Sequence, residues 1–266
     1  MRGLAVVLLL AVLAAPAASA QTRDSMEDGG ISRGQTRDGG ASEILQSIYI
    51  PPLVHAPFSA VVHTSWAKPL PGGGTLTVVN QRRIARDNNG RFFEERWTLT
   101  PVGQERGARQ TMIQIADPNT HTLWNCYMLQ EPHRCELEDF RGDPVKSYRP
   151  PTASSGPLAS FAGTSTHQNL GGRLVEDQQT TGTRDTFSYN TGVMGNDQAF
   201  SVVRETWYAP SLGINLISIV TDPRIGIETF TVTNIQLGEP ELTLFDLPTG
   251  FPKYDARKPA VEPSIP

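Results

Sequence analysis

The chain has 266 residues, of which 38% are hydrophobic and 19% charged, and its formal net charge at pH 7 is −4. Nucleic-acid-binding domains normally carry a basic surface, so this acidic balance argues against a nucleic-acid partner. From Pro51 to Tyr254 the chain is long enough for one β-rich domain with a hydrophobic core.

The N-terminus has the pattern of a secretory signal peptide. Arg2 precedes an apolar run from Leu4 to Ala15, and the small residues Ala18 and Ala20 precede the expected cleavage point. We therefore predict a signal peptide over residues 1–20 and export to the periplasm or the extracellular space. A membrane-spanning helix needs about 20 apolar residues, so this shorter run predicts no transmembrane anchor.

Residues 21–42 are rich in charge and glycine and contain almost no apolar side chains, so we expect a flexible lead. Ser42 is placed to cap a short helix that ends before Pro51. We expect a single β-rich domain over residues 43–255, followed by a loose tail over residues 256–266.

From Phe58 onward the sequence alternates apolar and polar residues, as expected for strands with one buried face. The first predicted strands lie within residues 58–70, 75–86 and 91–100. Glycine-rich and asparagine-rich stretches between them predict turns.

The charged stretch RDNNGRFFEERW is explained best as a hairpin turn with its flanking strands. A two-residue loop would place like charges opposite each other. A four-residue loop, residues 87–90, instead places Arg82 opposite Glu95. It also places Arg83 opposite Glu94, so each charge faces an opposite charge and the pairs stabilise the sheet.

Cys126 and Cys135 lie nine residues apart in WNCYMLQEPHRCEL. In an oxidising compartment this spacing predicts a disulfide between the arms of a hairpin. Such a bond contributes about 2–3 kcal/mol in the loop-entropy account. A redox pair or half of a metal site is the alternative, but CxxC spacing is absent.

Residues 141–170 contain four prolines and many small polar residues, and they interrupt the alternation. We expect a long mobile loop here, either a variable surface insertion or a lid over a cavity. Strands resume afterwards, with a hairpin turn predicted around residues 181–183 and a tight turn at DPRIG, residues 222–226. The stretch ELTLFDLP, residues 241–248, predicts a short turn or a 3₁₀ segment.

About nine or ten strands and no long helical period predict a mainly β fold. We expect a single curled antiparallel sheet or an open β-barrel, with one or two short helices.

The sequence contains no recognisable catalytic, nucleotide-binding or calcium-binding motif, and its histidines have no ligand spacing. We therefore predict no catalytic residue, no metal and no cofactor. A carboxylate pair could still serve a hydrolase. The carboxylates considered for such a pair are Glu94, Glu95, Asp117, Glu176, Asp177 and Glu205.

Aromatic residues are frequent in the predicted strands, where core packing explains most of them. Some could instead line the inner face of a curved sheet and contact an apolar ligand. The residues predicted to bind such a ligand are Trp66, Phe93, Trp97, Trp124, Trp207 and Phe230.

Residues 86–97, 181–213 and 222–251 resemble three motifs: RDSxGRxRxE, GTRxTxTIPxGxxGNxxxxxxxxExWYSPxL and DPRxGExTxxLxNIxxGEPDPSLFxVPxxY. These occur together in a group of secreted bacterial proteins of unassigned activity. The strand order and the closing LFDLP are similar, more weakly, to the periplasmic lipoprotein carriers of the LolA and RseB type. That resemblance implies an open barrel whose hydrophobic concavity takes up acyl chains.

The leading hypothesis is an exported, non-enzymatic β-domain that binds a hydrophobic or lipid-like ligand, or a cell-envelope protein, in the hollow of the sheet. One alternative is a secreted hydrolase that uses a carboxylate pair. The other is a structural protein-contact module, which would present an exposed strand edge and no pocket.

Overall fold

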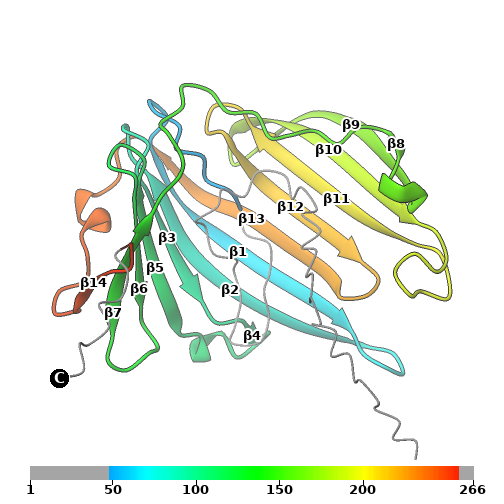
Figure 1. The fold of residues 1–266 in the computed structure, drawn as a ribbon, viewed down its shortest axis with the longest axis horizontal. Helices are drawn as coiled ribbons and strands as arrows, with labels where there is room; N and C mark the ends of the chain where they lie inside the picture. Colours follow the sequence, from blue (N-terminus) through cyan, green and yellow to red (C-terminus); the bar gives the residue numbers. More distant parts are fainter. Residues whose placement is uncertain (1–47, 258–266) are drawn as a thin grey trace, which may run out of the picture.

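The computed structural model describes residues 48–257, which form one strongly curved sheet that does not close into a barrel (Figure 1). The strand order is β14-β7-β6-β5-β3-β2-β1-β13-β12-β11-β10-β9-β8, with β4 paired to β2. This architecture confirms the predicted mainly β fold and the single curled sheet. The predicted signal peptide, the whole of the predicted lead and all of the predicted tail except residues 256 and 257 lie outside the described residues.

The strand bounds are β1 Phe58–Pro69, β2 Thr75–Arg86, β3 Phe92–Trp97, β4 Thr100–Pro101, β5 Gln110–Asp117, β6 Thr122–Tyr127, β7 Arg134–Asp139, β8 Gly156–Pro157, β9 Gly163–Val175, β10 Gln178–Tyr189, β11 Phe200–Ala209, β12 Ile214–Asp222, β13 Gly226–Leu237 and β14 Lys253–Asp255. All neighbouring pairs are antiparallel except β14 with β7.

The sheet consists of two runs of sequential hairpins. Strands β1 to β7 form one run and β8 to β13 form the other, and the two runs meet where β1 pairs with β13. At this seam Phe58 lies opposite Leu237. The two sheet edges, β14 and β8, therefore lie at opposite ends of the structure (Figure 1).

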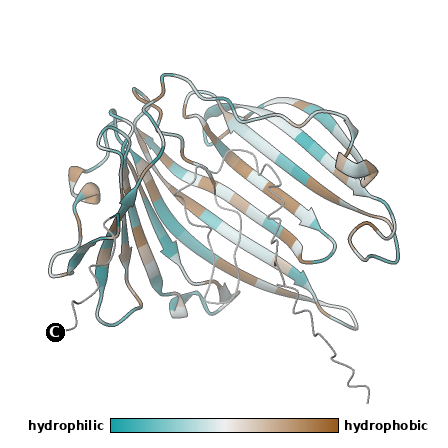
Figure 2. Cartoon of the chain, viewed as in Figure 1, coloured by the Kyte–Doolittle hydropathy of each residue, from teal (hydrophilic) through white to brown (hydrophobic). Residues whose placement is uncertain are grey.

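One face of the sheet carries the main hydrophobic core. In β1 every second residue from Phe58 to Val62 is buried, and Phe230 and Val232 of β13 join the same cluster. This two-residue period is the pattern that the sequence predicted, and Figure 2 shows hydrophobic and hydrophilic positions alternating along the strands. We call this side of the sheet the core face.

A chain of buried polar side chains crosses the core face from β2 to β7. The Glu94 carboxylate accepts hydrogen bonds from Arg82 at 3.3 Å and from Arg96 at 3.0 Å, and both arginines are almost fully buried. Arg96 continues the chain to Gln114, whose amide donates to Asn125. Buried charges that are paired in this way fix the arrangement of the strands, because breaking a pair leaves an uncompensated charge.

The hairpin between β2 and β3 differs from the predicted register by one residue. Ile84 lies opposite Glu94, and the ion pairs are Arg82 with Glu94 and Arg83 with Glu95, the reverse of the predicted pairing. The carboxylate of Asp87 accepts the backbone N–H groups of residues 89 and 91, which holds a longer loop than predicted. The interpretation of the stretch as a turn is confirmed.

The hairpin between β9 and β10 turns at Glu176 and Asp177, and not at residues 181–183 as predicted. Both turn residues have positive φ, 47° and 59°, as a two-residue hairpin loop of this twist requires. Residue 182 lies inside β10, and it is a glycine because a Cβ there would approach the Trp207 ring to 2.7 Å. A glycine selected by packing therefore resembled a turn glycine in the sequence.

The tight turn predicted at DPRIG is confirmed, since Asp222 of β12 lies opposite Gly226 of β13. The 3₁₀ segment predicted in ELTLFDLP is also confirmed as η3, Leu242–Phe245.

The other helical segments differ from the prediction. Within the described residues they are only the single turns η1, Glu105–Gly107, and η2, Ala159–Phe161, together with η3, and none has the length or apolar character of a membrane-spanning helix. Residues 48–50, at the end of the predicted first helix, are not helical.

The loop predicted over residues 141–170 is shorter in the structure, because residues 163–170 form the first part of β9. The remaining connection leaves β7, crosses above the sheet and reaches β8 (Figure 1). A parallel bridge between Leu53 and Val145 attaches it to the segment that precedes β1.

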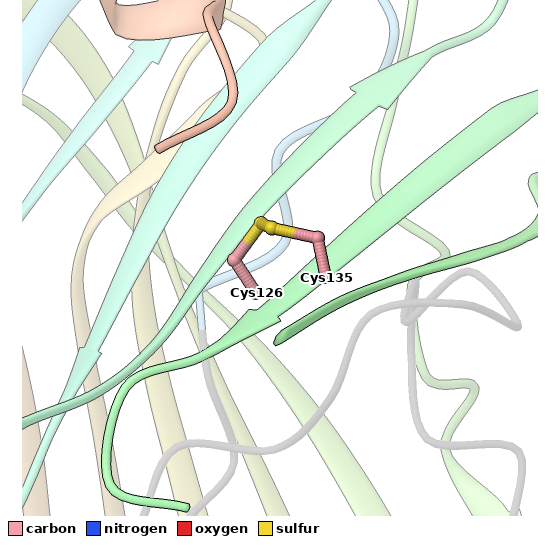
Figure 3. The surroundings of a disulfide bond; sticks show 2 residues. All are labelled: Cys126 and Cys135. Carbon is pink, nitrogen blue, oxygen red and sulfur yellow. A yellow bond between two sulfur atoms is a disulfide. The ribbon is translucent and has the colours of Figure 1, made fainter. Parts of the chain in front are cut away.

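Cys126 and Cys135 form the predicted disulfide (Figure 3). They lie opposite each other on β6 and β7, with their Cα atoms 4.0 Å apart. The bond joins the last two long strands on the β14 side of the sheet.

Candidate functional site

A cavity of about 1110 Å³ lies on the core face beside the main core, and we call it the larger cavity. Its floor is formed by β10, β11 and β12, and two connecting segments, residues 48–56 and 146–152, cover it. On the floor Thr206 lies opposite Ser218, which in turn lies opposite the core residue Phe230. Opposed residues share a face of the sheet, so the cavity is the continuation of the core into the second hairpin run.

The floor of the cavity is rich in hydroxyl groups. Thr181, Thr183, Thr206 and Ser218 line it, and the Thr183 and Thr206 hydroxyls are 3.0 Å apart. Short side chains leave the space above β10 to β12 unfilled. The hollow is therefore a direct result of small polar residues at inward positions of three adjacent strands.

The carboxamide oxygen of Asn215 is a further acceptor in this cavity. It is buried and has no hydrogen-bond partner among the described residues. A buried acceptor without a partner is unfavourable, so a donor from a bound molecule would stabilise it.

The covering segment 48–56 is held to the sheet by Arg86. Its guanidinium group is fully buried and donates to the carbonyl oxygens of Ala56 at 3.1 and 2.8 Å, Pro51 at 3.0 Å and Leu212 at 2.6 Å. The ring of Phe58 lies 5.0 Å from the guanidinium carbon. Burial lowers the pKa of Arg86 to about 10, so the side chain remains charged at neutral pH.

Three tyrosines form part of the cavity wall. The rings of Tyr49 and Tyr148 are 5.2 Å apart, and the Tyr208 hydroxyl donates to the Tyr148 carbonyl oxygen at 2.5 Å. Burial raises the pKa of all three hydroxyl groups, that of Tyr148 most strongly. These groups are therefore neutral at physiological pH and can donate and accept hydrogen bonds next to apolar ring surface.

The charged residues of the cavity are distributed unequally. On the floor Arg204 lies opposite Asp185, and the Asp185 carboxylate also contacts His167 Nδ1 at 2.5 Å. Lys146 and Arg149 line the cavity from the exposed covering segment. Three cationic side chains and one carboxylate therefore line a cavity in a protein of net negative charge.

A second cavity of about 910 Å³ lies on the opposite face of β1, β2 and β13. Trp97 and Glu95 line it together with hydroxyl-bearing residues such as Ser65 and Thr231. Glu95 accepts hydrogen bonds from the Arg83 side chain and from Trp97 Nε1, so its oxygens already have partners.

The structure does not gather the six aromatic residues predicted to bind a ligand. Trp66 and Phe230 lie on the core face, where both are buried, and Trp66 Nε1 donates to a backbone carbonyl. Phe93 and Trp124 lie on the opposite face and pack with Phe245 of η3.

Trp97 is the one member of the predicted set that lines either cavity, and it lines the second. Trp207 is also on the opposite face, where its ring lies under the Arg173 guanidinium group at 3.6 Å. Ligand contact by these aromatic residues remains a prediction, and the larger cavity is lined by other residues.

The carboxylates considered for hydrolysis have structural partners in most cases. Glu94 and Glu95 bind arginines, and the side chain of Glu176 accepts a backbone N–H. Glu205 accepts hydrogen bonds from Arg184 and Trp207, which lower its pKa. Asp117 accepts the backbone N–H of residue 119, as a turn residue does.

Asp185 is the one carboxylate that lines the larger cavity among the described residues, so a carboxylate pair has no second member there. Within residues 48–257 no cluster of histidine, cysteine, aspartate and glutamate is arranged to hold a metal ion.

Comparison with known proteins identifies no family. No protein-family model matches the sequence, and no curated protein matches it either. The fold has relatives among solved structures. A chain of the Pseudomonas aeruginosa MucA/MucB complex is 12% identical over 73% of this chain and 56% of that chain, with a TM-score of 0.39.

A LolA superfamily protein from Nitrosomonas europaea is 10% identical over 72% of this chain and 90% of its own, with a TM-score of 0.28. LprF from Mycobacterium bovis is 10% identical over 70% of this chain and 87% of its own, also with a TM-score of 0.28. The similarity to lipoprotein carriers expected from the sequence is thus found again among solved structures. The chain spans little more than half of the MucA/MucB chain it matches.

Sequence reasoning missed the residues that form the larger cavity. The useful signal was a small set of hydroxyl-bearing residues on the face where β1 and β13 have apolar residues: Thr181 and Thr183 at alternate positions of β10, Thr206 of β11 and Ser218 of β12. The contribution of Tyr49 and Tyr148 had no such signal, because both lie in irregular segments.

Proposed function

We propose that this protein is an exported, non-enzymatic β-domain that binds a hydrophobic or lipid-like molecule in the larger cavity. The observation that carries the proposal is a cavity of about 1110 Å³ between the sheet and two crossing segments. Cavities for small ligands typically measure about 300–1,000 Å³, so this one is large enough for a substantial organic molecule.

The chemistry of the lining supports a binding role. Apolar groups such as Ile48, Leu53 and Val220 share the cavity with the hydroxyl-bearing floor. Ligand sites combine apolar walls with a few polar groups that set orientation. The described lining offers one carboxylate, which is orientated by a histidine, and it offers no second acid for the hydrolase alternative.

A cavity-filling substitution tests the proposal. Purified, delipidated protein is titrated with a fluorescent fatty acid, and Ser218→Phe is compared with Thr221→Phe, which changes the opposite face of the same strand. We expect Ser218→Phe to weaken uptake by about tenfold or more, since the added ring occupies the ligand volume. Uptake that is absent in folded wild-type protein, or equal in the two variants, would contradict the proposal.

A second candidate function is protein contact through the edge of β9. Strand β8 pairs only with Thr164 and Ser165, so residues 166–175 of β9 have no strand neighbour on that side within the described structure. Leu174 is 60% exposed there. An unpaired edge can receive an extended segment of a cell-envelope protein. Leu174→Pro should abolish capture of such a partner without changing fatty-acid uptake, and retained capture would exclude this edge.

A further inference from the structure

The charges of the larger cavity extend the proposed function, on which this inference rests. On the floor, Asp185 lies opposite the cation Arg204 in the strand register, and its carboxylate contacts His167. The remaining charged groups of the lining, Lys146 and Arg149, are both cationic. Both belong to the exposed covering segment, so the excess positive charge lies at the rim of the cavity.

Neither rim cation has a carboxylate within ion-pair distance among the described residues, although the partly or fully exposed cations Arg91, Arg184 and Arg257 each have one. Arg149 lines the same cavity as the hydroxyl-bearing side chain of Tyr208. Burial raises the pKa of the Tyr208 hydroxyl, and the charges of Arg149 and Arg86 oppose this shift. A cation beside partly buried hydroxyl groups is favourable for an anion, because screening by water is reduced there.

The interior of the cavity is apolar and hydroxyl-lined rather than cationic. Leu53, Val54 and Val220 contribute apolar surface, and the floor hydroxyls and the Asn215 oxygen contribute hydrogen-bonding groups. A free inorganic anion would leave this surface without a partner. A molecule with an apolar body and one charged end would use both parts.

We infer that the ligand is an anionic amphiphile whose phosphate or carboxylate group binds Arg149 and Lys146 at the rim while its apolar part enters the cavity. Guanidinium and ammonium groups bind these anions through charge-assisted hydrogen bonds. The headgroup preference then comes from the covering segment, and the capacity for apolar surface comes from the sheet.

Three probes that share or lack an alkyl chain test the inference. Isothermal titration of the delipidated full chain uses dodecyl phosphate, dodecyl maltoside and inorganic phosphate. We expect dodecyl phosphate to bind at least about tenfold more tightly than dodecyl maltoside, with the difference reduced at high salt. Inorganic phosphate alone should bind much more weakly than dodecyl phosphate.

Variants assign the preference to residues. Arg149→Gln and Lys146→Gln should each reduce the preference for dodecyl phosphate and leave binding of dodecyl maltoside unchanged. Arg141→Gln is the matched control, because Arg141 is exposed on the same connection and does not line the cavity. It should keep the full preference.

The outcomes separate this inference from the proposed function. Equal binding of the two dodecyl compounds by wild-type protein would overturn the anionic ligand and leave the proposed function standing. Binding of neither would overturn the proposed function itself. If both glutamine variants keep the preference for dodecyl phosphate, the assignment to the rim is wrong. If inorganic phosphate binds as tightly as dodecyl phosphate, the apolar part does not contribute and the amphiphilic ligand is wrong.

Discussion

Replacing Arg86 by methionine should destabilise the protein and loosen the segment that covers the cavity. Methionine has a similar length and no hydrogen-bond donor. The carbonyl oxygens of Ala56, Pro51 and Leu212 would lose their Arg86 donors in a buried position. The Pro51 oxygen keeps the Leu53 N–H as a donor, so two acceptors are left unsatisfied, and at about 1–3 kcal/mol each they cost about 4 kcal/mol together.

Part of this loss is offset. Burial lowers the pKa of Arg86 to about 10, and a shift of this size from the usual value corresponds to about 3 kcal/mol of desolvation that methionine does not incur. The expected net loss for Arg86→Met is therefore about 1 kcal/mol. For a domain of this size that lowers the melting temperature by about 2–4 °C.

Urea denaturation followed by circular dichroism measures the free energy of unfolding, and hydrogen exchange measures the local effect at residues 51–56. Arg141→Met is the control, because Arg141 is exposed. Surface substitutions of this kind change stability by only about 0.5 kcal/mol. If Arg86→Met is as stable as Arg141→Met and residues 51–56 exchange at the wild-type rate, the anchoring role is wrong.

Four further outcomes are expected. Glu94→Gln should cost about 3–5 kcal/mol in urea unfolding, because it leaves two buried arginines without their carboxylate; a cost below about 1 kcal/mol would contradict this. Gly182→Ala should cost about 1–3 kcal/mol and shift tryptophan fluorescence, since its Cβ meets the Trp207 ring at 2.7 Å; an unchanged spectrum would refute the contact. Cys126→Ser should cost about 2–3 kcal/mol, and reduction of the wild type should reproduce that loss but have no effect on the variant. Stability should fall as pH rises above about 10, because the unfolded chain releases the Tyr148 proton that the folded chain retains, and Tyr148→Phe should reduce this slope.

The sequence predicted those parts of the fold that depend on local alternation. The buried positions of β1 follow directly from its two-residue period, and the cysteine pair follows from spacing and compartment. The turn at residues 222–226 was also predictable, because aspartate, proline and glycine occur together there.

Loop geometry was less accessible, because it depends on individual hydrogen bonds. One carboxylate, that of Asp87, lengthens the hairpin loop by accepting two backbone N–H groups, and the change reverses which arginine binds which glutamate. The glycine at position 182 was equally hard to interpret from the sequence. It is explained only by Trp207, which lies opposite it on β11.

The cavity depends on contacts between distant parts of the chain. Its floor requires β10 to β12 to lie beside one another, and its cover requires residues 51–56 to be held by Arg86. The six large aromatic residues predicted from the sequence to contact a ligand do not line this cavity. The hollow forms where inward side chains are small, and a single sequence does not show which face of a strand is inward at such positions.

The seam between β1 and β13 has a consequence for how the chain folds. Each hairpin run can assemble from strands that follow one another closely, so its contacts close short loops. The seam instead joins Phe58 to Leu237, and it cannot form until nearly the whole domain is present. Because closing this long loop costs more conformational entropy than closing a hairpin, we expect the pairing of β1 with β13 to be the slow step of folding. Until it forms, β1 is paired on one side only, and this step determines the folding rate.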